Sequence, residues 1–160
     1  PGHTFGHLCV FDTKNKAIFG GDAVQGSVYP SVEGGAALGP TYLYVDSYLM
    51  TIRYLKSLGA EMLCLAHWPV KNGNEVGEFL DESRNYVDQA DRLILEAIEQ
   101  AKSGLTMREL MAELGPKLGE WPREADDLLA FSFLGHLERF ESRGLVTRDS
   151  TASPVRFAVS

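Results

Sequence analysis

Apolar runs in the first part of the chain predict a small sheet. Residues 7–12 and 16–20 are short and apolar, and the polar residues 13–15 separate them, which is typical of a β-hairpin. Residues 61–66 form a continuous apolar run after one acidic residue, the pattern of a strand that is buried on both faces.

Two stretches show helical spacing of apolar residues. Within residues 44–58, apolar residues recur every three or four positions, and Gly59 ends the pattern. Residues 74 to about 102 carry one long apolar stripe. Residues 23–40, in contrast, are rich in Gly, Ser and Pro and show no period. We expect a long loop there, of the kind that often carries function.

The pattern changes after Ser103 and Gly104. Thr106 and Glu109 form a capping box that begins a helix, which we expect to stop at Gly115–Pro116. A second helix is predicted over 124–143, followed by strands at 145–148 and 155–159. Helix, helix and hairpin outline a winged helix, so the expected domains are 1–102 and 103–160.

Charge limits the partners of the chain. Its 160 residues carry a formal net charge of −7, and residues 104–160 hold seven basic and nine acidic side chains. Because DNA binding needs clustered Lys and Arg, DNA is not an expected partner.

No run of about 18 apolar residues is present, so no membrane span is expected. We expect a cytoplasmic protein.

Three polar side chains follow or precede the predicted strands in a pattern typical of a metal site. His3 precedes the first strand and Asp22 follows the second, so both emerge at the same end of the hairpin. His67 follows the third strand at its C-terminal tip. Imidazole and carboxylate groups suit Zn²⁺, or Fe and Mn. A histidine after a strand is also commonly a turn or core residue, and geometry alone leaves both interpretations open.

Three motifs in this order resemble those of the metallo-β-lactamase superfamily. Residues 1–7 (PGHTFGH) are similar to its Pro-Gly-His-Thr-Pro-Gly motif, although Phe5 stands where proline is usual. Residues 18–22 (IFGGD) resemble its strand that ends in Gly-Asp, and residues 65–70 (LAHWPV) resemble its last ligand motif. The resemblance implies an α+β fold: the C-terminal half of an αββα sandwich, followed by the winged-helix-like tail.

The resemblance also implies a function. His3 would bind a first metal ion, Asp22 would bridge two ions and His67 would bind the second, with zinc as the expected metal and Fe or Mn as alternatives. Asp22 and His67 would then be catalytic, and a metal-bound hydroxide would hydrolyse an ester, thioester, lactone or related bond of a small molecule. Trp68 stands where glycine is common, and it is expected either to bind substrate or to pack against the long helix.

The superfamily's His-x-His-x-Asp-His motif is absent from this chain. We therefore expect the chain to begin within a longer protein and to be inactive alone, with an upstream half or a second copy covering apolar residues Phe11, Ile18, Phe19 and Leu63. The tail resembles that of the lactamase-beta-2-like branch, where it lies beside the active site. The alternatives are a winged-helix interaction module and an RNA-cleaving nuclease of the same fold.

Overall fold

The computed structural model describes residues 1–160 as an α+β chain with eight short strands. The strands are β1 (Val10–Asp12), β2 (Ala17–Gly21), β3 (Tyr29–Pro30), β4 (Ala36–Leu38), β5 (Met62–Leu65), β6 (Lys71–Asn72), β7 (Val146–Asp149) and β8 (Arg156–Val159). The helices are α1 (Val45–Ser57), α2 (Asn74–Gln100), α3 (Met107–Leu118), the 3-10 helix η1 (Arg123–Leu128) and α4 (Leu129–Ser142).

The main sheet has the strand order β1-β2-β5-β6, and the hairpins β3-β4 and β7-β8 are separate. The predicted β1-β2 hairpin is confirmed as an antiparallel pair, and β5 joins β2 in parallel after α1. Because β2 and β5 are parallel, their C-terminal ends lie at the same edge of the sheet.

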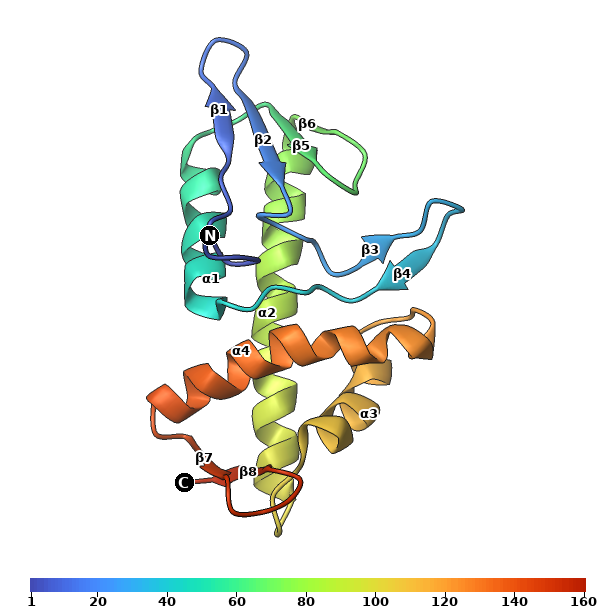
Figure 1. The fold of residues 1–160 in the computed structure, drawn as a ribbon. Coiled ribbons are helices and arrows are strands. Elements are labelled where there is room, and N and C mark those ends of the chain that lie inside the picture. The colour runs from blue at the N-terminus through green and yellow to red at the C-terminus, as the bar shows by residue number, and fades with distance from the viewer.

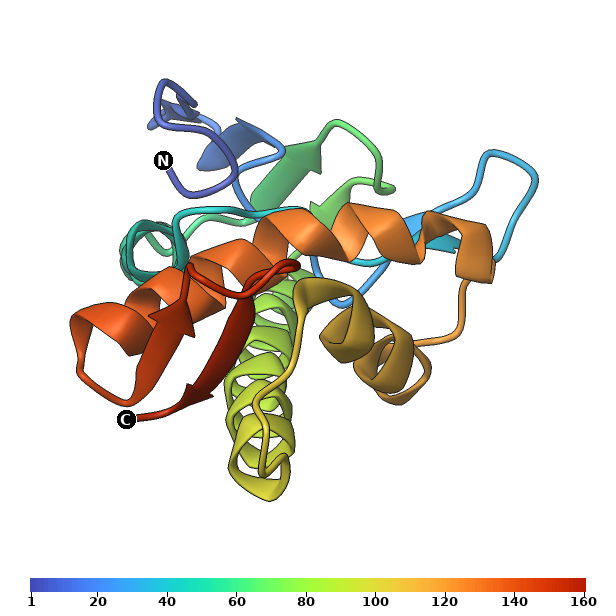
Figure 2. The ribbon, with the colours of Figure 1, turned by 60° about the horizontal axis from the view of Figure 1, so that its bottom comes forward.

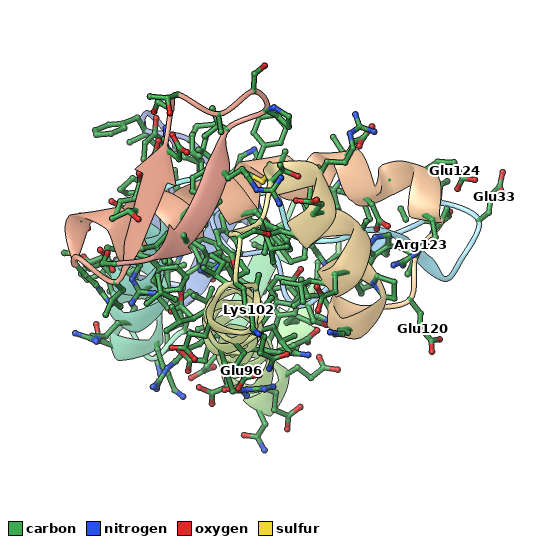
Figure 3. The ribbon with its side chains drawn as sticks, turned by 90° about the horizontal axis from the view of Figure 1, so that it is seen from below. Glu33, Glu96, Lys102, Glu120, Arg123 and Glu124 are labelled. Atoms are coloured by element: carbon green, nitrogen blue, oxygen red, sulfur yellow. The ribbon has the colours of Figure 1, made fainter.

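Helix α2 is the long axis of the molecule (Figure 1). The sheet and α1 lie around its first half, and α3, α4 and the β7-β8 hairpin surround its second half. Turned so that its bottom comes forward, the molecule shows α4 crossing α2, with α3 on one side and the hairpin on the other (Figure 2). Seen from below, Glu33 of the β3-β4 loop and Glu124 of η1 lie at one end of the molecule (Figure 3), where β4 contacts η1.

One hydrophobic core runs through the chain. Its 28 buried residues extend from Ile18 in β2 to Phe157 in β8 and include side chains of every α-helix. The expected division between residues 102 and 103 therefore falls inside a continuous core, and it stays a prediction.

Strand alternation corrects our expectation about the uncovered apolar residues. Phe11 pairs with Ile18 and Ile18 with Leu63, and this face packs into the core, where Ile18 and Leu63 have no exposed surface. Phe19 lies on the opposite face beside Val10, and these two side chains are 51% and 64% exposed. Side chains alternate between faces along a strand, so only part of the predicted set is uncovered.

The tail also differs in detail from the prediction. The capping box is confirmed, with the Thr106 hydroxyl accepting from the Glu109 amide and the Glu109 carboxylate accepting from the Thr106 amide. The helix, however, continues past Pro116 to Leu118. Proline removes one helical hydrogen bond, but the extra turn buries Leu118 in the core, and the helix ends at Gly119. No helix of the chain is long and apolar enough to cross a membrane.

Candidate metal centre

Asp22 and His67 meet at the edge of the sheet where β2 and β5 end. The register pairs Gly21 with Leu65, so the residues that follow them are neighbours. The His67 Nε2 lies 3.3 Å from the Asp22 Oδ1, and the two side chains are 52% and 24% exposed. The structure thus brings two of the three expected site residues together.

The Asp22 Oδ1 is buried and has no hydrogen-bond partner. His67 is close enough for an ion pair, but the contact does not meet the geometric criteria for a hydrogen bond. A buried carboxylate oxygen without a donor is costly, so such an atom calls for another electropositive partner.

The spacing of the pair suits a shared metal ion. Two ligands at about 2.0–2.1 Å from a tetrahedral zinc lie about 3.3–3.4 Å apart. The observed separation of 3.3 Å therefore agrees with a common ion between the Asp22 oxygen and the His67 nitrogen.

His3 lies in an N-terminal loop that is fastened to the start of α1. The carbonyl oxygen of Gly2 accepts hydrogen bonds from the Leu43 and Tyr44 amides at 3.1 and 2.9 Å. Gly2 has a φ of 136°, and a Cβ there would lie 2.6 Å from the Cα of Tyr48. The close approach and this backbone conformation both require glycine, which explains why it precedes the candidate ligand.

Gln25 is fully buried and connects His3 to Asp22. Its Nε2 lies 3.0 Å from the His3 Nδ1 and donates to the Asp22 carbonyl at 3.3 Å, while its Oε1 accepts from the Thr41 amide at 2.8 Å. The Thr41 and Asp22 contacts fix which end of the amide faces His3, so Gln25 donates to the His3 Nδ1.

This hydrogen bond sets the tautomer of His3. In neutral His3, an Nδ1 that accepts from Gln25 leaves the proton on Nε2, so neither nitrogen offers a free lone pair to a metal. Zinc ligation by His3 therefore requires the Gln25 amide or the His3 ring to turn. The Asp22–His67 pair fits a metal as it stands, whereas His3 does not.

The structure does not assemble the full ligand set expected from the sequence. No group of three or more His, Cys, Asp or Glu side chains lies close enough to hold a metal ion. His7, next in the same loop, donates from Nε2 to the Gly20 carbonyl at 2.8 Å and so stabilises the end of β2.

Trp68 packs behind the pair. Its indole donates to the Val28 carbonyl at 3.0 Å, and its ring centroid lies 4.7 Å from that of Tyr29 and 5.6 Å from that of Phe79 on α2. These contacts agree with the expectation that Trp68 packs against the long helix. Substrate binding by Trp68 stays a prediction.

Tyr29 and Gln25 are the site residues that the sequence analysis missed. The Tyr29 ring lies 5.2 Å from that of His67, and burial followed by the nearby charge of Asp22 raises the pKa of its phenol. Both residues lie in or next to the long irregular loop, where no period distinguishes an inward side chain. Their separation from His3 and His67 in sequence hid the contacts.

No known protein family matches the sequence, and no curated protein matches it. Solved structures do match the fold. One is a metallo-beta-lactamase family protein from Thermus thermophilus, with 21% identity, a TM-score of 0.72, and coverage of 100% of this chain and 47% of that one. Another is a beta-lactamase domain protein from Burkholderia ambifaria, with 14% identity, a TM-score of 0.74, and coverage of 99% and 46%.

The chain spans about half the length of both solved structures, since it covers 47% and 46% of them. Identities this low establish the fold alone. Over its whole length, this chain has the fold of about half of a metallo-beta-lactamase family protein.

Proposed function

We propose that this chain supplies part of the active site of a metal-dependent hydrolase acting on an ester, thioester, lactone or related bond of a small molecule. The observation that supports this most strongly is the buried Asp22 Oδ1, which lacks a hydrogen bond and lies 3.3 Å from the His67 Nε2. A carboxylate and an imidazole at this spacing are typical zinc ligands.

In this proposal Asp22 and His67 would hold one metal ion, and His3 together with Asp22 would hold a second. Zinc is the expected metal, and Fe or Mn would accept the same ligands. His3 would join the site only once its ring or the Gln25 amide turned, because a ligand histidine normally donates its other ring proton to an acceptor.

The ligand count requires a second part of the protein. A catalytic zinc takes about three protein ligands and keeps one position open, so two zinc ions need about five or six ligands, with one shared. This chain offers three. We infer that the remaining ligands come from an upstream segment, which would also cover Val10 and Phe19 on the exposed face of the sheet.

A metal bound here would supply a water that ionises near neutral pH. The residues of this chain would position the metal ion. Asp22 is held by the end of β2, and Gln25 fastens its backbone carbonyl to the His3 loop. Tyr29, Trp68 and Phe79 pack in a row beside His67, so bulk water is excluded from that side of the pair.

We also propose that residues 103–160 form a winged-helix-like tail. Its support is the order α3, η1, α4 and the β7-β8 hairpin, together with a bridge between Leu105 and Phe157 that adds a third extended segment. The acidic character of the tail makes contact with the hydrolytic site or another protein a better role than DNA binding.

Metal content and turnover in the protein that includes the upstream segment test the proposed function. Asp22→Asn and His67→Gln should each lose about one equivalent of zinc and most hydrolytic activity, because each removes a ligand. The matched controls are Asp81→Asn, an exposed carboxylate on α2, and His7→Gln, which keeps a donor for the Gly20 carbonyl.

Elemental analysis and assays with simple esters and thioesters provide the readout, with circular dichroism confirming the fold. Full metal occupancy in both ligand variants would contradict the assignment. A protein with its upstream segment but no stoichiometric metal would favour the interaction-module alternative instead.

A further inference from the structure

An apolar cavity of about 370 Å³ opens beside His3. Residues 3–5 of the N-terminal loop form one wall, and Thr41, Leu43 and Tyr44 of the segment that leads into α1 form another. The third wall comes from the tail, through Leu128 at the end of η1 and Phe131 in α4. Segments distant in sequence thus build one hollow, where the chain before α1 runs along α4 (Figure 1).

The cavity and the candidate metal centre share structural elements. His3 is both a proposed ligand and a lining residue. Thr41 lines the cavity as well, and its amide donates to the Gln25 Oε1, whose Nε2 contacts the His3 Nδ1. A molecule held in the cavity therefore lies against the same residues that position His3.

The lining of the cavity selects against charge. None of its eight residues is an Asp, Glu, Lys or Arg, and the acidic chain as a whole carries a net charge of −7. The lining therefore offers an anionic group no Lys or Arg partner.

The same lining leaves large apolar side chains exposed. Phe5 is 77% exposed and contacts Tyr44 edge to face, while Phe131 and Leu128 are 52% and 39% exposed. Their apolar surface favours an uncharged hydrocarbon group in the cavity, since binding removes that surface from water.

We propose that this cavity binds the neutral apolar substituent of the substrate, such as a medium-length acyl chain, whose ester or thioester bond is hydrolysed at the metal centre. The inference rests on the proposed hydrolase function and assigns its substrate class. Leu128 and Phe131 make the tail a determinant of substrate specificity.

The substrate test uses the zinc-loaded protein with its upstream segment and p-nitrophenyl acetate, butyrate and hexanoate. Each added methylene should raise kcat/KM by about 2- to 4-fold, as expected for burial of a methylene group. Phe131→Ala and Leu128→Ala should reduce this gain to less than about 1.5-fold per methylene, because the cavity then lacks a wall. The ratio between hexanoate and acetate is the quantity compared.

Leu145→Ala is the matched control. Leu145 lies in the same tail, is 42% exposed and does not line the cavity, so its variant should keep the wild-type ratio. A binding measurement without turnover completes the test: in metal-free protein, hexanamide should shift the methyl NMR signals of Leu43 and Leu128, and acetamide should not.

The outcomes separate the two proposals. A length-dependent gain that Phe131→Ala and Leu128→Ala remove, together with the hexanamide shifts, supports the inference. Metal-dependent acetate hydrolysis without length dependence, or with a gain that both variants keep, overturns the inference and leaves the hydrolase intact. If hexanamide does not shift these methyl signals, the cavity does not take up the apolar group, and this result also overturns the inference. Absence of metal-dependent turnover of any ester overturns the proposed function and the inference with it.

Discussion

Gln25 orients His3 at the candidate site, although its residue type is not that of a metal ligand. Its amide oxygen accepts from the Thr41 amide and its nitrogen faces both the Asp22 carbonyl and the His3 Nδ1. The buried amide is therefore held in the orientation that withholds the His3 lone pairs from a metal. A substitution at Gln25 should therefore change the affinity of the proposed His3 site for zinc.

Replacing Gln25 with glutamate tests this interpretation. In Gln25→Glu, a carboxylate oxygen would accept the His3 Nδ1–H while the other oxygen still accepts from Thr41, so zinc affinity should rise about 10-fold in the protein with its upstream segment. Chelator competition measures the change. Gln100→Glu, which adds the same charge at an exposed position, should leave the affinity unaltered. An unchanged or weaker affinity in Gln25→Glu would refute the role given to the amide.

At the scale of the elements, a buried polar cluster fastens α4 to the rest of the molecule. His136 on α4 is fully buried; its Nδ1 lies 2.6 Å from the Asp91 Oδ1 of α2 and its Nε2 lies 2.8 Å from the Tyr42 hydroxyl. Arg139 contacts the other Asp91 oxygen. Burial alone would raise the pKa of Asp91, but the hydrogen bond and charge of His136 and the charge of Arg139 lower it overall.

Asp91→Asn should therefore lower the free energy of unfolding in a pH-dependent way. At pH 7 we expect a loss of about 2 kcal/mol, less than the value for a fully buried pair because Asp91 is 22% exposed. A lowered pKa in the folded state stabilises the protein above the unfolded pKa of about 3.9, and this contribution disappears as the pH falls through the folded value.

Urea unfolding at pH 7 and at acid pH measures the effect. The gap between wild type and Asp91→Asn should close below about pH 4. Asp88→Asn, an exposed carboxylate on the same helix, should stay within about 0.5 kcal/mol of wild type at pH 7. A gap that persists undiminished at pH 3 would argue against the charge of Asp91 as its cause.

Local patterns predicted most of the elements. The hairpin at β1-β2, helix α2 and the Thr106–Glu109 capping box each depend on residues close in sequence. The end of α3 was misplaced because burial of Leu118, a tertiary effect, outweighed the local signal of Pro116. The Tyr42–His136 contact joins positions 94 residues apart, and no local pattern encodes such a pairing.

In the whole molecule, a continuous core coexists with apolar side chains that are exposed on one face of the sheet. A single core joins the sheet, the helices and the tail, while Val10 and Phe19 remain exposed on the outer face of the sheet. The sequence placed Asp22 and His67 each at the end of a strand, and the structure brings them together because β2 and β5 run parallel and end at one edge. The arrangement of His3 depended on Gln25 and could not be read from spacing.

The proposed function requires that this chain hold part of a hydrolytic metal centre and that an upstream segment complete it. Zinc retained after dialysis and zinc-dependent ester turnover should be measured for residues 1–160 alone and after mixing with the upstream segment. For the chain alone we expect less than about one tightly held zinc and no turnover, because three ligands divided between two ions hold neither well. Mixing with the upstream segment should restore both. Stoichiometric zinc with metal-dependent turnover by residues 1–160 alone would contradict this requirement.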